Sequence, residues 1–212
     1  MVEKMLSKQQ IKDINRLKQK KHRNQEGLFI VEGIKSIKEF LKSDYELYKL
    51  FSTVDLFSTK DEDFEIISEN ELAKLSSYKT PQVALGVFKK REQKVIRPQE
   101  LSLVLSDIND PGNLGTLIRL CDWYGISNVY CSMETVDCYN PKVVQASMGS
   151  LSRVRVFYTD ILEMLSQCDL PVYGAVMNGK SVYASELPEK ALLVIGNEAN
   201  GINENLMSGL DH

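Results

Sequence analysis

The sequence has few of the residues that build metal and disulfide sites. Its 212 residues include four cysteines and two histidines. The cysteines form no Cys-x-x-Cys pair, and two histidines add little to a ligand set, so we expect no zinc site and no other metal. We interpret the four as reduced, mostly buried thiols of a cytosolic protein, at Cys121, Cys131, Cys138 and Cys168.

Long apolar runs and phosphate-binding glycine loops are also missing. The longest apolar stretches, such as Leu101–Leu105 and Ala191–Ile195, have the length of a strand and are too short to span a bilayer. The N-terminus is charged where a signal peptide would need an apolar core, so we expect a cytoplasmic protein with no membrane partner. Neither the Gly-x-Gly-x-x-Gly fingerprint nor a Gly-x4-Gly-Lys-Ser/Thr loop occurs.

The net charge of −3 hides an asymmetry between the two halves of the chain. Residues 1–99 hold 20 Lys and Arg against 15 Asp and Glu, whereas residues 100–212 hold 6 against 14. The first 23 residues carry eight basic and two acidic side chains. A basic half joined to an acidic half suggests an RNA-facing module attached to another domain. A solvated, lysine-rich helix is the alternative interpretation of the basic run.

The N-terminal part is predicted to be a compact α/β unit. The spacing of Ile11, Ile14 and Leu17 predicts a helix from Ser7 to Lys21, which would align Lys12, Arg16 and Lys20 on one face. Further helices are expected at 32–41 and 69–75. Strands are expected at 28–31, 45–54, 64–67 and 82–88. We take residues 1–93 as one domain and 94–99, a polar stretch containing Pro98, as a linker.

From Leu101 onward, strands alternate with helices, which is typical of a parallel sheet covered by helices on both faces. We take residues 100–212 as this second domain, so the fold class is α/β with two domains. Strands are expected at 101–106, 128–131, 154–157, 172–177 and 191–195. Helices are expected at 113–124, 141–148, 160–167 and 203–208.

Two segments in this second domain have the composition of ligand-binding turns. Asn109–Arg119 runs from a strand into a helix whose buried side is predicted to hold Leu114, Leu117, Ile118, Cys121 and Tyr124, which leaves Arg119 off the buried stripe. Ile195–Gly201 follows an apolar strand, at the edge where open α/β sheets bind ligands. The alternative for the first segment is an ordinary turn with a surface arginine. The alternative for the second is a helix-entry turn with capping residues.

Taken together and in this order, Asp107-Ile-Asn-Asp-Pro-Gly-Asn-Leu-Gly-Thr-Leu-Ile-Arg119 and Leu192-Leu-Val-Ile-Gly-Asn-Glu-Ala-Asn-Gly-Ile202 resemble two of the three signature motifs of the SpoU (TrmH) group of SPOUT RNA methyltransferases. The resemblance implies S-adenosylmethionine-dependent 2′-O-methylation of a ribose, in ribosomal RNA more than in transfer RNA. The N-terminal part resembles the family's substrate-binding domain of ribosomal-protein-like fold, through Phe29–Gly33 and Thr80–Val87.

The resemblance also implies roles for individual residues. Asn113, Arg119 and Glu198 match the family's catalytic site, while Ala199 departs from the glycine that the family has after its glutamate. S-adenosylmethionine would lie against Gly196, Ala175, Met177, Ile195 and Asn197. The candidates for binding RNA are the basic residues Lys12, Arg16, Lys20, Lys21 and Arg23.

The family's third motif is absent before His212, so the resemblance implies a domain that is incomplete at its C-terminus. The complete family domain forms a trefoil knot and a homodimer. A chain without the third motif is expected to bind S-adenosylmethionine weakly or not at all, and to transfer no methyl group.

Three questions stay open on the residues alone. The resemblance implies that Arg119 helps to deprotonate the ribose hydroxyl. A guanidinium stays charged, however, so an equal alternative is that Arg119 binds a phosphate through two hydrogen bonds. A non-catalytic RNA-binding protein on the same scaffold is one rival function, although Asn113, Arg119 and Glu198 occur together. The other rival function is that of a nucleotide- or NAD-dependent enzyme. The absence of both phosphate-binding glycine loops argues against it.

Overall fold

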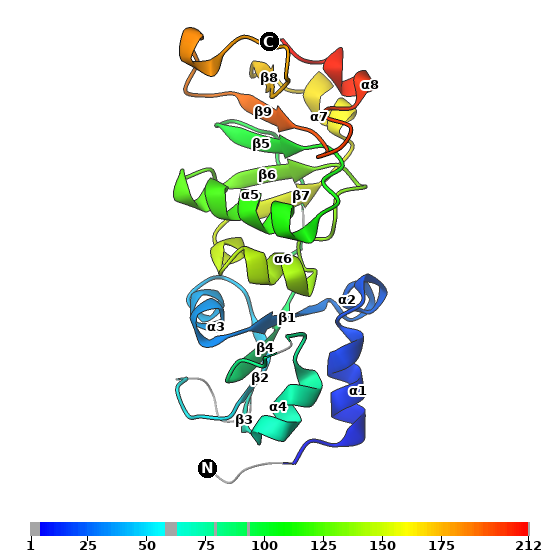
Figure 1. The fold of residues 1–212 in the computed structure, drawn as a ribbon, viewed down its shortest axis with the longest axis vertical. Helices are drawn as coiled ribbons and strands as arrows, with labels where there is room; N and C mark the ends of the chain where they lie inside the picture. The colour runs from blue at the N-terminus through cyan, green and yellow to red at the C-terminus, as the bar shows by residue number, and fades with distance from the viewer. Residues whose placement is uncertain (1–4, 58–62, 79, 93, 212) are drawn as a thin grey trace. The chain divides into compact units, whose positions relative to one another are not determined.

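The computed structural model describes residues 5–57, 63–78, 80–92 and 94–211. The expectation about the chain end at His212 therefore concerns a residue outside the described ranges. The chain divides into two compact units (Figure 1). The first contains the residues up to Glu92 together with Asp137–Ser152, and the second contains the remaining residues. The segment Asp137–Ser152 thus packs with the N-terminal unit although the sequence predicted it within the second domain.

The first unit is built on a four-stranded sheet of order β1-β4-β2-β3. β4 pairs antiparallel with both β1 and β2, and β2 pairs parallel with β3. All of the predicted strands are present, with ends that differ by a few residues. The elements are α1 (Lys8–Arg16), α2 (Lys20–Glu26), β1 (Leu28–Glu32), α3 (Ile34–Leu41), β2 (Leu47–Ser52), β3 (Phe64–Ile66), α4 (Glu69–Leu75), β4 (Ala84–Lys89), α6 (Pro141–Ala146) and a 3-10 turn η2 (Ser150–Ser152).

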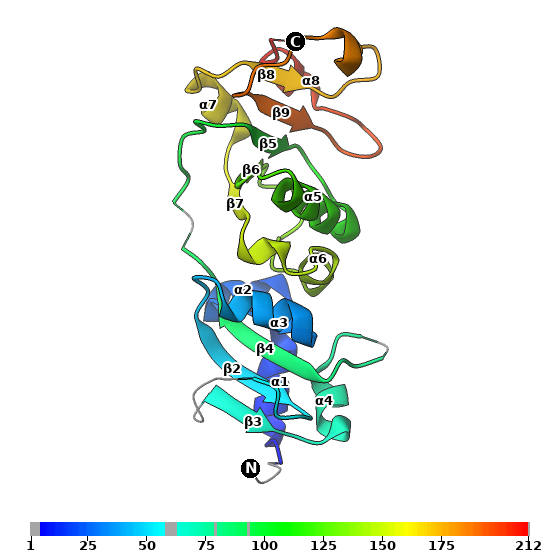
Figure 2. The ribbon, with the colours of Figure 1, turned by 90° about the vertical axis from the view of Figure 1, so that its left-hand side faces the viewer.

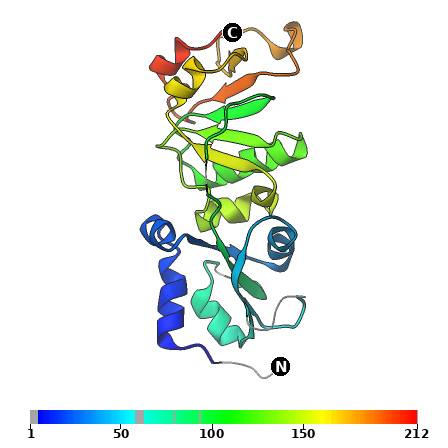
Figure 3. The ribbon, with the colours of Figure 1, turned by 180° about the vertical axis from the view of Figure 1, so that it is seen from behind.

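Helices cover both faces of this sheet. α1 and α4 lie side by side on one face (Figures 1 and 3), where Ile14 and Leu17 pack with Ile30, Phe51 and other apolar side chains of the sheet and of α4. The other face holds an aromatic cluster to which the later segment contributes Tyr139. The Tyr139 ring lies 4.6 Å from that of Phe29, and its hydroxyl is 3.2 Å from that of Tyr45.

The single helix predicted from Ser7 to Lys21 is wrong. α1 ends at Arg16, Gln19 is extended, and α2 starts at Lys20. The Arg23 side chain explains the break, because its Nη1 donates to the carbonyls of Leu17 (3.0 Å) and Lys18 (2.9 Å). These carbonyls would otherwise continue the helix.

Arg23 is buried, with 1% of its surface exposed. Its Nε and Nη2 both donate to Oδ2 of Asp137, at 2.9 and 2.6 Å. Burial of a charge is costly unless the charge is paired and hydrogen-bonded, and this guanidinium is both. Arg23 therefore joins α2 to the later segment Asp137–Ser152 within the first unit.

The second unit is built on a parallel sheet of five strands, in the order β7-β6-β5-β9-β8. Each strand runs parallel to its neighbours, as the alternating pattern predicted. Its elements are β5 (Ser102–Leu105), α5 (Pro111–Trp123), β6 (Asn128–Cys131), β7 (Arg155–Tyr158), α7 (Ile161–Ser166), β8 (Val172–Gly174), a 3-10 turn η3 (Val182–Ala184), β9 (Leu192–Ile195) and α8 (Glu204–Met207).

In this unit α5 lies on one face of the sheet, and α7 lies on the other (Figure 2). The side chains of α7 and α8 pack against Val104, Val194 and other apolar residues of the strands. On α5 the predicted buried stripe is confirmed for Leu114, Ile118 and Cys121. It is wrong for Tyr124, which caps the helix end and is 73% exposed.

The buried thiol of Cys121 gives an expected pH dependence. Burial raises the pKa of this thiol from 9.0 to about 12. The folded state therefore favours the neutral thiol, and this contribution to stability is present below pH 9 and is lost as the pH rises toward 12. We expect the free energy of unfolding, measured in urea, to fall over this range. The fall should be shallower in Cys121→Ala, and equal slopes in the two proteins would contradict the assignment.

All four cysteines are free thiols, three of them buried and Cys168 half-buried, which confirms that part of the sequence interpretation. Across the ranges that the structure describes, no helix has the length and apolar character needed to cross a membrane.

Candidate active site

The carboxyl ends of β5, β9 and β8 meet at one edge of the parallel sheet. β9 lies between the other two strands, paired with β5 from Ser102↔Leu192 to Leu105↔Ile195 and with β8 up to Gly174↔Val194. The segments that follow these strands are the two turns singled out in the sequence and the loop that starts at Ala175. The fold therefore brings the predicted catalytic and cofactor segments to a common edge, which is where open α/β sheets bind ligands.

Gly196 is required by a close approach of two backbone segments. A Cβ at this position would lie 2.1 Å from the carbonyl carbon of Gly201 and 2.2 Å from the nitrogen of Ile202. The next residue, Asn197, exchanges two backbone hydrogen bonds of 2.9 Å with Gly201. The segment Gly196–Gly201 is therefore a closed loop that a side chain at its first position would force open.

Asn197 holds this loop in shape and ties it to the turn after β5. Its Oδ1 accepts from the backbone N–H groups of Ala199 (2.9 Å) and Asn200 (3.1 Å). Its Nδ2 donates to the carbonyl of Asp107 at 2.7 Å. The polar atoms of this side chain are thus already engaged in hydrogen bonds within the protein.

Asp107 is a residue whose role the sequence did not reveal. It has a φ of 60°, in the left-handed region that non-glycine residues seldom adopt. Ser132 stabilises this conformation, because its Oγ accepts from the Asp107 N–H (3.0 Å) and donates to Asp107 Oδ1 (2.8 Å). Aspartate tolerates the left-handed region better than most residues. The sequence alone does not predict its contact with Ser132, which follows the end of the neighbouring strand β6.

The two sequence motifs meet through a side-chain hydrogen bond. Asn113 Nδ2 donates to Glu198 Oε1 at 2.6 Å. Asn113 is held in the first turn of α5, where Pro111 opens the helix and Asp110 caps it by accepting from the Asn113 N–H at 2.9 Å. Both side chains are exposed, so the oriented carboxylate of Glu198 is accessible to a ligand.

Arg119 is exposed on α5, as predicted from its place off the buried stripe. It is six residues beyond Asn113, which corresponds to a rise of about 9 Å and about one and two-thirds turns, so the two positions face directions about a third of a turn apart. The fold therefore joins Asn113 to Glu198 directly, and it places Arg119 farther along the same helix.

The loop after β8 exposes apolar side chains at the same edge of the sheet. Met177 is fully exposed and Val176 is 38% exposed, whereas the backbone of Ala175 is fixed by its N–H bond to the Val194 carbonyl at 2.9 Å. Ile195 is half-buried. Apolar side chains with fixed backbone groups beside them fit the adenosine end of S-adenosylmethionine, so the residues present are compatible with this group.

A small hollow of about 210 Å³ lies at the ends of β5, β6 and β7. Its lining includes Asp107, Ser132 and Asn203, and it contains none of the residues predicted to bind the cofactor.

The basic residues predicted to bind RNA are divided by the break between α1 and α2. Lys12 and Arg16 are exposed on α1, and Lys20 and Lys21 are exposed on α2, so they do not form the single row that one helix would give. Arg23 is withdrawn from this set, because its guanidinium is buried against Asp137 and cannot reach a phosphate.

Comparison with known proteins accounts for both parts of the chain. Residues 100–212 match the model of the SpoU rRNA Methylase family. The chain belongs to the SpoU family. Residues 8–86 match a second model, the MRM3-like substrate binding domain. The resemblance inferred from the two motifs is confirmed.

The relatives include proteins named as rRNA methyltransferases. The 23S rRNA (guanosine(2553)-2′-O)-methyltransferase RlmP of Bacillus subtilis is 28% identical over 212 aligned positions, which cover 96% of this chain and 85% of RlmP. Mitochondrial rRNA methyltransferase 3 of Xenopus laevis is 34% identical over 66% of this chain, but the match spans only 37% of that longer protein.

Solved structures of SpoU-type proteins have the same fold. A TrmH-family protein from Porphyromonas gingivalis is 34% identical and superposes with a TM-score of 0.90, over 98% of this chain and 87% of the other. The AdoMet-bound rRNA methyltransferase from Sinorhizobium meliloti is 25% identical, with a TM-score of 0.85 over 99% and 85% of the two chains. The predicted parallel-sheet domain with an N-terminal substrate-binding domain is confirmed.

Proposed function

We propose that this protein transfers a methyl group from S-adenosylmethionine to the 2′-hydroxyl of a ribose in RNA, most directly ribosomal RNA. The observation that carries the proposal is the Asn113–Glu198 hydrogen bond, which joins the two motifs at the carboxyl edge of the sheet. Family membership and the rRNA substrates named for RlmP and rRNA methyltransferase 3 support it. Transfer RNA is the next candidate substrate.

S-adenosylmethionine, when bound, supplies a methyl group made electrophilic by the sulfonium. Gly196, Ala175, Ile195 and Met177 would hold it at the ends of β8 and β9. The AdoMet-bound structure of the Sinorhizobium meliloti enzyme supports this part of the proposal. Asn197 contributes by shaping the loop, since its amide group is already bonded on both sides.

The side chains of this chain have separable tasks in the transfer. The ribose hydroxyl must lose its proton as its oxygen attacks the methyl carbon, and a carboxylate or water can accept that proton. Asn113 orients the Glu198 carboxylate for such contacts. A guanidinium stays charged, so we assign Arg119 to the phosphate beside the target ribose and to stabilising charge that develops on the oxygen.

Residues 1–93 are proposed to bind the RNA and residues 100–212 to carry the chemistry, with 94–99 as the linker. We further propose a homodimer. The exposed Leu120, Trp123 and Tyr124 at the end of α5 supply an apolar face of the kind that a second copy covers. The trefoil knot of the family fold and a cytoplasmic location belong to the same proposal.

The basic surface of α1 and α2 gives a test of RNA binding. Changing Lys12, Lys20 and Lys21 to alanine should weaken RNA binding and reduce the slope of log K against log salt by about 0.7 to 0.9 for each phosphate contact that is lost. Binding of S-adenosylmethionine should be unchanged. Fluorescence anisotropy over a salt series measures the slope.

The matched control changes Lys35, Lys38 and Lys42 on and after α3, which removes the same number of charges from a different surface of the unit. If both triple variants lose the same affinity, the effect comes from net charge alone, and the assignment of α1 and α2 as the RNA-binding surface is wrong.

The function itself is tested by expressing the protein from its whole gene and incubating it with methyl-labelled S-adenosylmethionine and rRNA from cells that lack the gene. Label should appear in a dinucleotide that resists alkaline hydrolysis, because a 2′-O-methyl group removes the hydroxyl on which that hydrolysis depends. Label on a base would contradict ribose methylation.

A further inference from the structure

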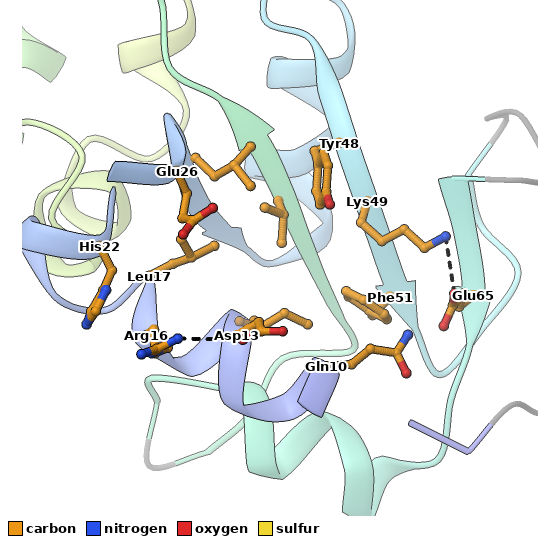
Figure 4. Close-up of a pocket in the computed structure, with 13 residues that line it drawn as sticks. Gln10, Asp13, Arg16, Leu17, His22, Glu26, Tyr48, Lys49, Phe51 and Glu65 are labelled. Atoms are coloured by element: carbon orange, nitrogen blue, oxygen red, sulfur yellow. Dashed lines mark ion pairs between the residues drawn. The ribbon is translucent and has the colours of Figure 1, made fainter. Parts of the chain in front are cut away.

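A cavity with a volume of about 620 Å³ lies in the first unit, and none of the residues that line it is among those assigned above to methyl transfer. α1 and α2 form one wall, and the sheet forms the other (Figure 4). Its apolar floor comes from Leu28, Phe51 and Val87. A volume of this order is typical of sites for small organic groups.

Tyr48 and Lys49 reach this cavity from the same side of β2, although neighbours on a regular strand point to opposite faces. The register explains this. Leu47 faces Phe88 and Lys49 faces Val87 of β4, so Tyr48 is an extra residue in a β-bulge. Bulges re-aim side chains and occur often beside functional sites. Tyr48 is 54% exposed. The bulge turns its side chain toward the cavity, whereas regular pairing would point it to the other face of the sheet.

The rim of the cavity combines hydrogen-bond donors with acceptors. Arg16 and His22 supply donors from the helical wall, and Lys49 is paired with Glu65 at 3.1 Å on the sheet side (Figure 4). Asp13 and Glu26 add carboxylates, which only accept hydrogen bonds. An aromatic ring with both kinds of polar group suits a nucleobase, which stacks and bonds along its edge.

We propose that this cavity binds one unstacked nucleotide of the RNA, with its base on Tyr48 and an exocyclic amino group donating to Glu26 or Asp13. The inference rests on the proposed RNA substrate, and the exposed Lys12, Lys20 and Lys21 on the same two helices give the adjoining backbone a basic path. Cytosine has both a ring that can stack on Tyr48 and an exocyclic amino group that can donate to a carboxylate. Uracil has the same ring but a carbonyl in place of the amino group, so it should bind more weakly.

Labelled RNA decamers of cytidylate and uridylate test this on the full chain. The wild-type protein should bind the cytidylate more tightly, and Tyr48→Ala should weaken that binding by about tenfold, the usual loss for one stacked base. Tyr48→Phe, which keeps the ring, should bind within about twofold of wild type. Glu26→Gln should reduce the preference for cytidylate over uridylate.

Tyr183→Ala is the matched control, since Tyr183 is an exposed tyrosine of the other unit. Equal losses in Tyr48→Ala and Tyr183→Ala, no loss in Tyr48→Ala, or no binding of either decamer by wild type would each overturn the proposal. A decamer built from 5-iodocytidine, which keeps the exocyclic amino group, should attach on irradiation to the peptide of wild type that contains β2. This result does not depend on whether a variant folds, and attachment only elsewhere would also overturn it.

Methyl transfer to rRNA, measured in parallel, separates this inference from the proposed function. If wild type transfers methyl groups and Tyr48→Ala binds and transfers as well as wild type, the cavity is not a nucleotide site but the proposed methyltransferase function is supported. If decamer binding depends on Tyr48 but wild type transfers no methyl group, the cavity stands and the function fails.

Discussion

We expect Arg119→Ala to lower methyl transfer by about 100- to 1000-fold, the loss typical of removing one group that stabilises charge in a transition state. The side chain is exposed on α5, outside the buried stripe of Leu114, Ile118 and Cys121, so the fold and the thermal unfolding midpoint should be almost unchanged. Initial rates with labelled S-adenosylmethionine and rRNA give the effect on activity.

Arg119→Lys separates the two roles considered for this residue. An ammonium cannot reproduce the planar, two-point contact of a guanidinium with a phosphate, so this variant should fail almost as badly as the alanine variant. Arg155→Ala, which removes an exposed arginine from β7 of the same unit, is the control and should keep its activity. Substantial activity in Arg119→Lys would exclude the bidentate role.

The largest expected effect on stability follows from the buried pair Arg23–Asp137. Arg23→Met leaves the carboxylate of Asp137 buried and uncompensated, which should cost about 3 to 5 kcal/mol. For a chain of this size that corresponds to a fall of about 10 °C in the unfolding midpoint. Calorimetry or circular dichroism gives the value directly.

Two further variants identify the cause. Arg23→Met with Asp137→Leu removes both charges and should recover much of the loss, because burial of an uncompensated charge is the main cost. Arg153→Met breaks the more exposed pair Arg153–Asp122, whose atoms are 2.7 Å apart, and should cost less than about 1 kcal/mol. If Arg23→Met and Arg153→Met lower the free energy of unfolding equally, burial of the Arg23–Asp137 pair does not increase its contribution to stability.

Local patterns were sufficient to predict most strands and the parallel sheet. β6 occupies the predicted residues Asn128–Cys131, whereas β5 is one residue shorter than predicted at each end and β9 is one residue shorter at its start. These strands are short runs of mostly apolar, mostly buried residues, which can be recognised from the local sequence. The turn Asp107–Arg119 could be recognised because its residues are contiguous.

Most of the departures depend on contacts between residues that are distant in sequence. The helix predicted from Ser7 to Lys21 is broken because Arg23 is drawn to Asp137, 114 residues away. The left-handed Asp107 depends on Ser132, and the bulge at Tyr48 depends on how β2 aligns with β4. No periodicity along the chain carries this information, since it arises only when the sheets assemble.

The same reason limited the prediction of the site. The motifs identified Asn113 and Glu198 through the family resemblance, but their hydrogen bond of 2.6 Å links residues 85 positions apart. Gly196 was assigned to the cofactor, whereas the geometry adds a backbone requirement, because Gly201 leaves no room for a Cβ. A residue can satisfy both demands, and only the structure separates them.

The most direct test of the proposed function is a map of 2′-O-methyl groups in rRNA from cells with the gene, without it, and with an Arg119→Ala copy. The account predicts one ribose methylation that is present in the first strain, absent from the second, and still absent when Arg119→Ala protein is produced at the wild-type level. An unchanged map after deletion, or full methylation restored by the Arg119→Ala copy, would contradict it.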